Sequence, residues 1–376
     1  MDIVLFSFDK LHGRVGRAHH FARHLARRHR VFFVDPLASL LGCRRLATTA
    51  EMSEDGIVHV VLSAGLPGRM LAPVHLLNEV RWLADVRKVL RRCDWGSRGV
   101  RVCLHMLPVW ERAAAGLRPD VTVYDAHDNW RAMPRNPRRL TERLEAAHAR
   151  SADIILAASD ATSRNFAALG RQTHPMPNAC DPDHFAQALT ECQAKELADI
   201  PRPRITFIGG LEESFNTDAV LQVARHMRDT SFVIIGPEIK PQDALRSEPN
   251  VYLLSQRPYD ELPSYLAGAD VCWIPYRLTE RVMGRDCIKL YEYLASGRPV
   301  VSVPLPRAVE LANCLQVTDG TADGLIRACR AAMKDDTAEK RDARLALARR
   351  NSWANRVEQL ESFIERFCAT GRDPSE

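Results

Sequence analysis

Short apolar runs alternate with longer amphipathic segments along the first half of the chain. Runs that are almost wholly apolar predict parallel strands, because a strand with helices on both sides has no polar face. The segments between them place apolar residues at helical spacing and predict the covering helices. The predicted strands are residues 2–8, 31–35, 58–64, 100–106, 121–126 and 152–158, and the clearest helices are residues 16–28 and 69–92.

The same alternation starts again after a polar stretch, residues 177–203, which contains turn residues and no strand pattern and is therefore the expected linker. We therefore expect an α/β protein of two doubly wound domains, residues 1–178 and 200–350, that face each other across a cleft. A last helical pattern within residues 351–376 precedes no strand, so we expect this helix to return to the first domain. The second set of predicted strands is 204–210, 231–237, 250–255, 269–276 and 299–303, with a helix near 216–228.

The composition is typical of a soluble globular protein. The chain has 376 residues, of which 46% are hydrophobic and 26% charged, and this length favours two domains. No apolar run approaches the roughly 18 residues of a membrane span, and the opening stretch MDIVLFSF resembles a strand more than a signal peptide. Ten cysteines without a C-x-x-C pair favour reduced thiols over disulfides or a zinc site, so we expect a cytoplasmic location.

The charge is unevenly distributed between the two halves. Residues 1–180 contain 27 Lys and Arg against 17 Asp and Glu, whereas residues 181–376 contain 25 against 30. The basic amphipathic segment 68–93 suggests a peripheral contact with an anionic membrane surface, although a core helix with a solvated basic face would show the same pattern. Aromatic residues are not interleaved with the basic ones outside this segment, which argues against nucleic-acid binding. After Met70, the cations of the segment are Arg81, Arg87, Lys88, Arg91 and Arg92.

One stretch of the second half, DCIKLYEYLASGRPVVSV (286–303), suggests a phosphate site at the start of a helix. Asp286 is a good N-cap residue, which would put Lys289 in the first helical turn. A lysine there opposes the helix dipole unless an anion binds beside it. Glu292, one turn later on the same face, can accept hydrogen bonds from a sugar diol. The alternative is a surface pair between Lys289 and Glu292.

The motif IKLYEYLASGRPVVS (288–302) resembles the donor-site signature of GT-B glycosyltransferases, above all bacterial enzymes of exopolysaccharide, capsule and teichuronic-acid assembly. VYDAHDNW (123–130), PNACDPDHF (177–185), IGGLEESFN (208–216) and SW…R (352–356) continue the resemblance in the same order. The resemblance implies a second domain that binds a nucleoside-diphosphate sugar and a first domain that binds a glycan acceptor, with a lipid-linked acceptor expected. The donor-binding residues that it implies are Gly209, Gly210, Arg257, Pro258, Tyr276, Ile288, Lys289, Leu290 and Glu292.

The chain departs from this family at one position. Many retaining members have a second glutamate eight residues before the one that matches Glu292, and Gly284 occupies that position here. The motif at residues 123–130 also resembles that of the inverting xanthan glucuronosyltransferase, in which an aspartate is the base. The matching residue, Asp128, is therefore the predicted catalytic base, with Asp125 as an alternative. Both carboxylates could instead only cap the turn.

The loop after the first predicted strand, residues 7–20, matches the acceptor loop of the same family. Asp9, Gly13, Gly16 and Arg17 are the predicted acceptor contacts, although an ordinary strand-to-helix turn has similar glycines. The Asp-Pro-Asp sequence at 181–183 imitates a metal site. GT-B enzymes generally use no catalytic metal, so we expect none, and no cofactor beyond the sugar nucleotide itself.

Two other functions fit the same residues. A nucleotide-sugar-binding protein without transferase activity would need the donor residues but not Asp128. A GT-B epimerase would convert a free sugar nucleotide without any acceptor.

Overall fold

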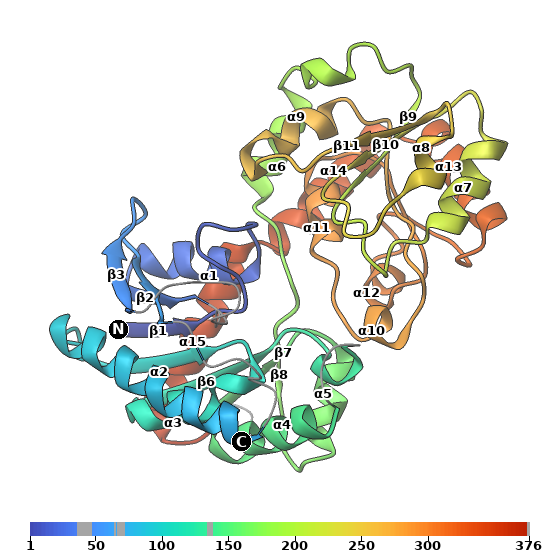
Figure 1. Ribbon diagram of the computed structural model, residues 1–376. Helices are drawn as coiled ribbons and strands as arrows, with labels where there is room; N and C mark the ends of the chain where they lie inside the picture. The colour runs from blue at the N-terminus through green and yellow to red at the C-terminus, as the bar shows by residue number, and fades with distance from the viewer. Residues whose placement is uncertain (36–46, 64, 66–71, 134–137, 374–376) are drawn as a thin grey trace. The chain divides into compact units, whose positions relative to one another are not determined.

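The computed structural model describes residues 1–35, 47–63, 65, 72–133 and 138–373 (Figure 1). The chain divides into two compact units, the first made of residues 1–177 and 353–376 and the second of residues 178–352. Each unit is an open, mainly parallel sheet with helices packed against it. The α/β class predicted from the apolar pattern is therefore confirmed.

The first unit contains an eight-stranded sheet in the order β3-β4-β2-β1-β5-β6-β7-β8. All neighbouring pairs are parallel except β3 and β4. The exposed edge strand β3 and the two-residue β8 lack a long apolar run, so the sequence pattern did not predict them. The strands are β1 Asp2–Phe6, β2 Arg30–Val34, β3 Thr49–Met52, β4 Val58–Val61, β5 Arg101–His105, β6 Val121–Ala126, β7 Ile154–Ala157 and β8 His174–Pro175.

The last helix of the chain, α15, belongs to the first unit and packs beside α1 (Figure 1). The indole of Trp353 stacks on the ring of His20, with centroids 5.0 Å apart, and meets Phe21 edge-on. Glu361 accepts hydrogen bonds from Arg28 and His29 at the end of α1. The helices of this unit are α1 Arg17–Ala26, α2 Ala72–Arg92, α3 Glu111–Leu117, α4 Arg138–Ser151, α5 Asp160–Ala167 and α15 Trp353–Thr370. Residues 69–71 of the predicted helix 69–92 lie outside the described part.

The second unit contains a six-stranded parallel sheet in the order β11-β10-β9-β12-β13-β14. The central strands β9, β10 and β12 are almost wholly buried, as their apolar sequences predict. The strands are β9 Arg204–Ile208, β10 Ser231–Ile235, β11 Val251–Leu254, β12 Val271–Ile274, β13 Val300–Ser302 and β14 Gln316–Val317.

Residues 178–203, expected from their polarity to be a linker, form part of the second unit. Phe185 and Ala188 lie in its main core, and Leu197 is buried against β10. The polar residues between these buried side chains obscured the apolar periodicity in the sequence. The helices of the second unit are α6 Pro182–Ala186, α7 Thr217–His226, α8 Asp243–Arg246, α9 Leu262–Ala267, α10 Glu280–Met283, α11 Ile288–Ala295, α12 Pro306–Glu310, α13 Ala322–Lys334 and α14 Ala338–Arg350.

Each sheet has a point at which the strand order reverses direction. In the first unit this point lies between β1 and β5, and in the second between β9 and β12. Connections leave the two strands in opposite directions there, which opens a crevice at their carboxyl ends. The residues that follow β1 and β5 in the first unit, and β9 and β12 in the second, therefore border these crevices, and those that follow β6 lie at the same edge of the first sheet.

Candidate functional site

The carboxyl ends of β9 and β12 hold the side chain of Lys289 in place. Its Nζ donates a hydrogen bond to the hydroxyl of Tyr276, two residues after β12, at 2.7 Å. The same Nζ lies 5.4 Å from the ring centroids of both Tyr276 and Phe207 in β9. A cation is thus fixed beside two aromatic faces at the point where the strand order reverses.

Lys289 carries its charge in a partly buried position at the start of α11. Burial lowers the pKa of Lys289, but the contacts with Tyr276 and Cys287 outweigh burial and leave the pKa above its ordinary value. The ammonium is therefore protonated at neutral pH. A cation in the first turn is disfavoured by the helix dipole, so an anion bound beside it would stabilise the arrangement.

Gly209 brings bare backbone against this lysine. Its φ is +156°, and a Cβ there would lie 2.6 Å from Cε of Lys289 and 2.8 Å from Nζ. Its N–H donates to the carbonyl of Ile235 at 2.8 Å, which fixes the turn beside β10. A side chain at 209 would push the ammonium away, so glycine is required for the observed geometry. Gly210, next in the chain, is partly exposed.

The helix α11 begins one residue later than predicted. Its N-cap is Cys287, without a side-chain cap. Asp286 instead accepts hydrogen bonds from the Asn178 backbone N–H at 2.7 Å and the Tyr291 hydroxyl at 2.8 Å. The prediction of Asp286 as N-cap was therefore wrong, because these partners, one of them distant in sequence, bind the carboxylate.

The other predicted residues of α11 differ in how accessible they are. Ile288 and Glu292 are partly buried, and Glu292 follows Lys289 by three residues on the same side of the helix. Leu290 is wholly buried, and its N–H donates to the carbonyl of Cys287 at 3.1 Å. A phosphate would have to displace this bond to use the Leu290 N–H.

Two arginines that the sequence analysis missed lie beside the same strand ends. Arg285 donates to Glu212 at 3.3 Å and to the Ser214 hydroxyl at 3.2 Å, and its guanidinium lies 5.1 Å from the Tyr276 ring centroid. Arg281 donates to the other oxygen of Glu212 at 3.4 Å. Burial alone would raise the pKa of Glu212, but the two arginines lower it below its ordinary value, so the carboxylate is charged.

A signal for these arginines was present in the sequence. Arg281, Arg285 and Lys289 are spaced four residues apart in RVMGRDCIK. This spacing predicts one side of a helix, although the helix is in fact interrupted between α10 and α11. Their three positive charges exceed the two negative charges of Glu212 and Glu292, so this side of the second unit suits an anion.

Arg257, a predicted contact of the nucleotide base, is bound to other residues in the structure. Its guanidinium donates to both carboxylate oxygens of Glu196 at 2.8 Å and to the Tyr265 hydroxyl at 2.7 Å. Hydrogen bonds from Tyr265 and Arg257 lower the pKa of Glu196. Pro258 is exposed and precedes a short 3-10 turn. Base binding by either residue stays a prediction.

In the first unit, Arg17 and Asp125 form a buried ion pair. Nε and Nη2 of Arg17 donate to the two carboxylate oxygens at 2.7 and 2.8 Å, and Nη2 also donates to the carbonyl of Met176 at 2.9 Å. The side chains are 1% and 0% exposed. The structure therefore contradicts two predictions, an acceptor contact by Arg17 and a catalytic base at Asp125. Both charged groups are buried and bind each other instead of facing a ligand.

Asp128 lies two residues after β6, and one of its carboxylate oxygens accepts the Asn129 backbone N–H at 2.8 Å. It is partly buried. The neighbouring His127 stacks on Phe8, with ring centroids 4.1 Å apart. This contact brings the loop after β1 beside the end of β6. Burial lowers the pKa of His127, and Asp125 and Asp128 only partly offset this effect.

Asp9, in the loop after β1, has its carboxylate close to the start of α1. A Cβ on Gly16 would lie 3.1 Å from Oδ2 of Asp9, so Gly16 leaves room for this carboxylate. Burial raises the pKa of Asp9, and the charge of Arg14 offsets this only in part. Gly13 is exposed, and its N–H donates to the carbonyl of Lys10 in a tight turn. Asp9 and Asp128 thus lie at the same edge of one sheet.

The described residues contain no cluster of three or more His, Cys, Asp or Glu side chains that could hold a metal ion. The Asp-Pro-Asp sequence has a local structural role, since Asp181 accepts the backbone N–H of His184 and caps α6. In the same part of the chain, no helix is long and apolar enough to cross a membrane.

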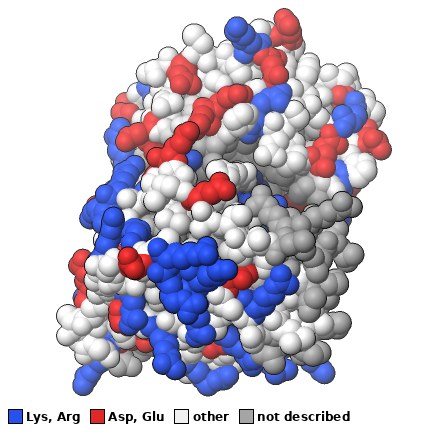
Figure 2. All heavy atoms as spheres, turned by 60° about the vertical axis from the view of Figure 1, so that its left-hand side comes forward, with Lys and Arg blue, Asp and Glu red and all other residues white. Residues whose placement is uncertain are grey.

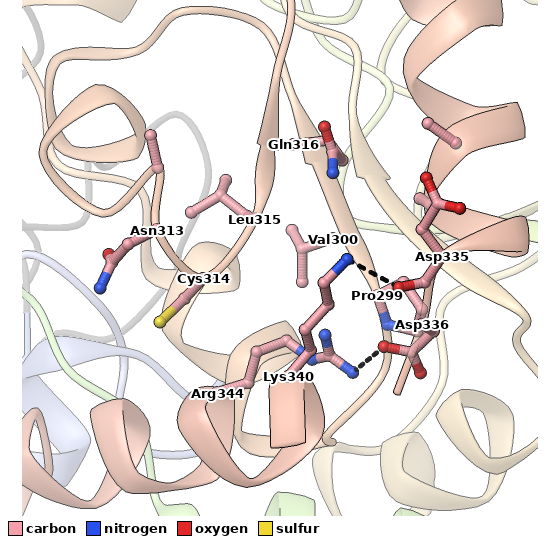
Figure 3. A pocket seen from close by; sticks show the side chains of 13 residues that line it. Pro299, Val300, Asn313, Cys314, Leu315, Gln316, Asp335, Asp336, Lys340 and Arg344 are labelled. Atoms are coloured by element: carbon pink, nitrogen blue, oxygen red, sulfur yellow. Dashed lines mark hydrogen bonds and ion pairs between the residues drawn. The ribbon is translucent and has the colours of Figure 1, made fainter. Parts of the chain in front are cut away.

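A cavity of about 80 Å³ lies elsewhere in the second unit (Figure 3). Val300 and Gln316, the first residues of β13 and β14, line it, so it lies at the opposite edge of the sheet from Lys289. The cations of Lys340 and Arg344 are bound to the Asp335 carbonyl and the Asp336 carboxylate. The cavity is therefore separate from the candidate anion site.

Comparison with known proteins assigns the fold. Residues 202–335 match the family model described as "Glycosyl transferases group 1". Sucrose-phosphate synthase from Thermosynechococcus elongatus superposes with a TM-score of 0.75, at 14% identity over 98% of this chain and 99% of that one. Anabaena HepE, solved in complex with UDP and glucose, superposes with a TM-score of 0.68, at 17% identity over 97% of this chain and 99% of that one. The chain has the GT-B fold.

A relative among the curated proteins is also described as a glycosyltransferase. The chain is 24% identical over 227 residues to the putative teichuronic acid biosynthesis glycosyltransferase TuaH of Bacillus subtilis (strain 168). The match spans 56% of this chain and 57% of the length of TuaH. The predicted resemblance to GT-B glycosyltransferases is thereby confirmed.

Proposed function

We propose that this protein is a glycosyltransferase that moves a sugar from a nucleoside-diphosphate sugar to a glycan acceptor. The observation that carries the proposal is the fixed ammonium of Lys289 beside Gly209 and Tyr276, at the carboxyl ends of β9 and β12. A diphosphate is the ligand whose charge and size suit such a point in an open α/β sheet. HepE, one of the similar structures, was solved with UDP, which supports the same ligand class.

The chemistry of the donor site follows from its charges. Lys289 and the start of α11 would stabilise the negative charge that develops on the leaving diphosphate, an electrostatic contribution to catalysis. Arg281 and Arg285 add positive charge nearby, and Glu292 is suited to accept hydrogen bonds from sugar or ribose hydroxyls. These roles require no metal ion, so we propose metal-independent transfer.

The first unit would supply the acceptor site and the base. Asp128 is the base that we propose, because it is partly exposed at the end of β6, whereas Asp125 is buried against Arg17. It would take the proton of the acceptor hydroxyl during attack on the anomeric carbon. Asp9 and Gly16 lie at the same sheet edge and would contact the acceptor. A base of this kind fits an inverting reaction.

The acceptor that we propose is a lipid-linked glycan at the cytoplasmic face of the membrane, as expected for surface-polysaccharide assembly. The relative TuaH is described as a teichuronic acid biosynthesis enzyme, and its role supports this class of acceptor.

The direct test is transfer of a radiolabelled sugar from candidate nucleoside-diphosphate sugars to membrane extract. A preliminary thermal-shift screen of nucleoside diphosphates would select the donor, because a ligand of the native state raises the unfolding temperature. Labelled lipid-extractable product would support the proposal. Donor binding without transfer would favour the non-catalytic binding protein, and conversion of the free donor without acceptor would favour the epimerase.

A further inference from the structure

The outer face of α2 exposes large apolar side chains. Leu77 is 60% exposed and Val80 is 63% exposed. They lie three residues apart, so they are neighbours on one side of the helix. Covering both side chains would remove apolar surface from water, which is favourable. The pair therefore marks a candidate contact surface.

The same helix exposes cations and no acidic side chain. Its two acidic residues are turned inward, since Glu79 is buried and Asp85 accepts hydrogen bonds from the Thr48 and Ser63 hydroxyls at 2.6 Å each. Arg112 on the adjoining helix α3 is also exposed. Figure 2, with the C-terminal end of α2 turned forward, shows Lys and Arg gathered on this side of the first unit. The exposed cations of α2 are Arg81, Arg87, Lys88, Arg91 and Arg92.

The helix has a defined direction across the sheet. In its middle, the Trp82 indole donates to the carbonyl of Ser63, which lies just past the end of β4. After its end, the Trp95 indole donates to the carbonyl of Asp2, at the start of β1. Because β4, β2 and β1 are parallel, α2 runs from the carboxyl edge of the sheet to its amino edge.

We propose that this outer face of α2, here called the α2 face, docks on an anionic lipid bilayer. It consists of Leu77, Val80 and the five exposed cations of α2. The apolar pair lies toward the carboxyl edge of the sheet, the edge that also carries Asp9 and Asp128. The orientation would present the acceptor residues to a lipid-linked sugar, a point that rests on the proposed function.

A bilayer fits the α2 face better than a protein partner does. Each lysine or arginine near an anionic lipid surface strengthens binding about fivefold, so five of them suffice without a large apolar area. Protein interfaces instead bury about 800 Å² per partner around aromatic and aliphatic cores from which lysine is depleted. Two aliphatic side chains inserted among lipid headgroups, with cations beside them, are typical of an interfacial helix.

The test is co-sedimentation of the full chain with vesicles of phosphatidylglycerol and phosphatidylcholine, or of phosphatidylcholine alone. We expect binding to the anionic vesicles only, weaker at 1 M salt because the Debye length shrinks to about 3 Å. Lys88→Glu with Arg92→Glu should weaken binding at least tenfold. The Leu77→Ser, Val80→Ser variant should also bind the anionic vesicles more weakly, and 1 M salt should release all of its remaining binding. All four positions are exposed, so thermal unfolding should be unchanged.

Arg330→Glu with Lys334→Glu on α13 is the matched control, since both residues are exposed and four apart, as Lys88 and Arg92 are. The control should bind like the wild type. Equal binding to neutral vesicles, equal losses in the control, or normal binding by both α2 variants would overturn the proposal. Lipid-free self-association that the Leu77→Ser, Val80→Ser variant abolishes would also overturn it, in favour of a second copy of the chain. Nucleotide binding, measured in parallel, separates these outcomes from failure of the proposed function.

Discussion

Arg17 and Asp125, 108 residues apart in the chain, are joined by two hydrogen bonds of 2.7 and 2.8 Å inside the first unit. The pair connects α1 to β6, and a further bond from Arg17 to the Met176 carbonyl extends the connection to the chain after β8. The exposed surface of both side chains is almost nil. Their role is to hold the carboxyl edge of the sheet together, which leaves Asp128 as the accessible carboxylate of its motif.

Arg17→Ala should lower the free energy of unfolding by about 3–5 kcal/mol, because it leaves the Asp125 charge buried without a partner. Urea unfolding followed by tryptophan fluorescence is suitable, since Trp353 lies 5.9 Å from the Arg17 guanidinium. Arg23→Ala is the control on the same helix. Its ion pair with Asp55 is exposed, and its loss should cost less than about 1 kcal/mol. Similar small effects of both changes would contradict the structural role of Arg17.

Asp128→Asn should lower the rate of sugar transfer by about 10²–10⁴ without weakening donor binding, because asparagine keeps the shape but cannot take a proton. The donor residues lie in the other unit. The measurement is transfer from a saturating radiolabelled donor, with donor affinity titrated separately. Asp120→Asn, at the start of β6 instead of its end, should leave the rate near normal. A wild-type rate in Asp128→Asn would exclude Asp128 as the base.

Lys289→Ala and Glu292→Ala should each weaken nucleoside-diphosphate binding by about 10- to 100-fold, the usual effect of losing a hydrogen bond to a charged group. Calorimetric titration measures this directly, with circular dichroism to verify folding. Lys334→Ala, an exposed lysine of α13 in the same unit, should bind as the wild type does. Unchanged affinity in both site variants would refute the donor site.

Transfer activity should survive an excess of EDTA, because the charge of the leaving group is assigned to Lys289, Arg281 and Arg285. The assay compares initial rates with and without chelator after dialysis. Loss of activity with EDTA and its recovery with magnesium or manganese would show that the protein groups are not sufficient.

The first unit should lose stability in mild acid. Burial lowers the pKa of His148 to about 3, against an ordinary value of 6.5, while a bond to the Pro108 carbonyl offsets burial in part. The unfolded chain therefore binds this proton and the native state does not, so the stability is complete above pH 6.5 and falls as the pH decreases toward 3. One such group contributes about 1.4 kcal/mol per pH unit in this window.

His148→Phe tests the assignment, since it keeps the stacking on Tyr124 but cannot titrate. Urea unfolding at pH 7, 6 and 5 should show a smaller loss for the variant than for the wild type, by about 2 kcal/mol between pH 6.5 and 5. Parallel curves for the two proteins would exclude His148 as a cause of acid sensitivity.

The local pattern of the sequence determined the fold class and the positions of most strands. Apolar runs such as residues 31–34 and 154–157 have no polar side, and only a sheet buried on both faces satisfies them. The motif residues after strands also follow from the sequence, because the carboxyl ends of parallel strands share one edge. Gly209, Tyr276 and Lys289 were expected together for this reason, and the fold brings them together.

Only the tertiary structure decided how the charged side chains are paired. Arg17 was expected to contact an acceptor, but Asp125, 108 positions later, neutralises its charge. Asp286 was expected to cap a helix, but its carboxylate binds Asn178 and Tyr291 instead. Ion pairs of this kind depend on distance in space, which local propensity and periodicity do not encode. The sequence alone therefore supplied the charged residues at the strand ends, and packing decided which of them remain available for a ligand.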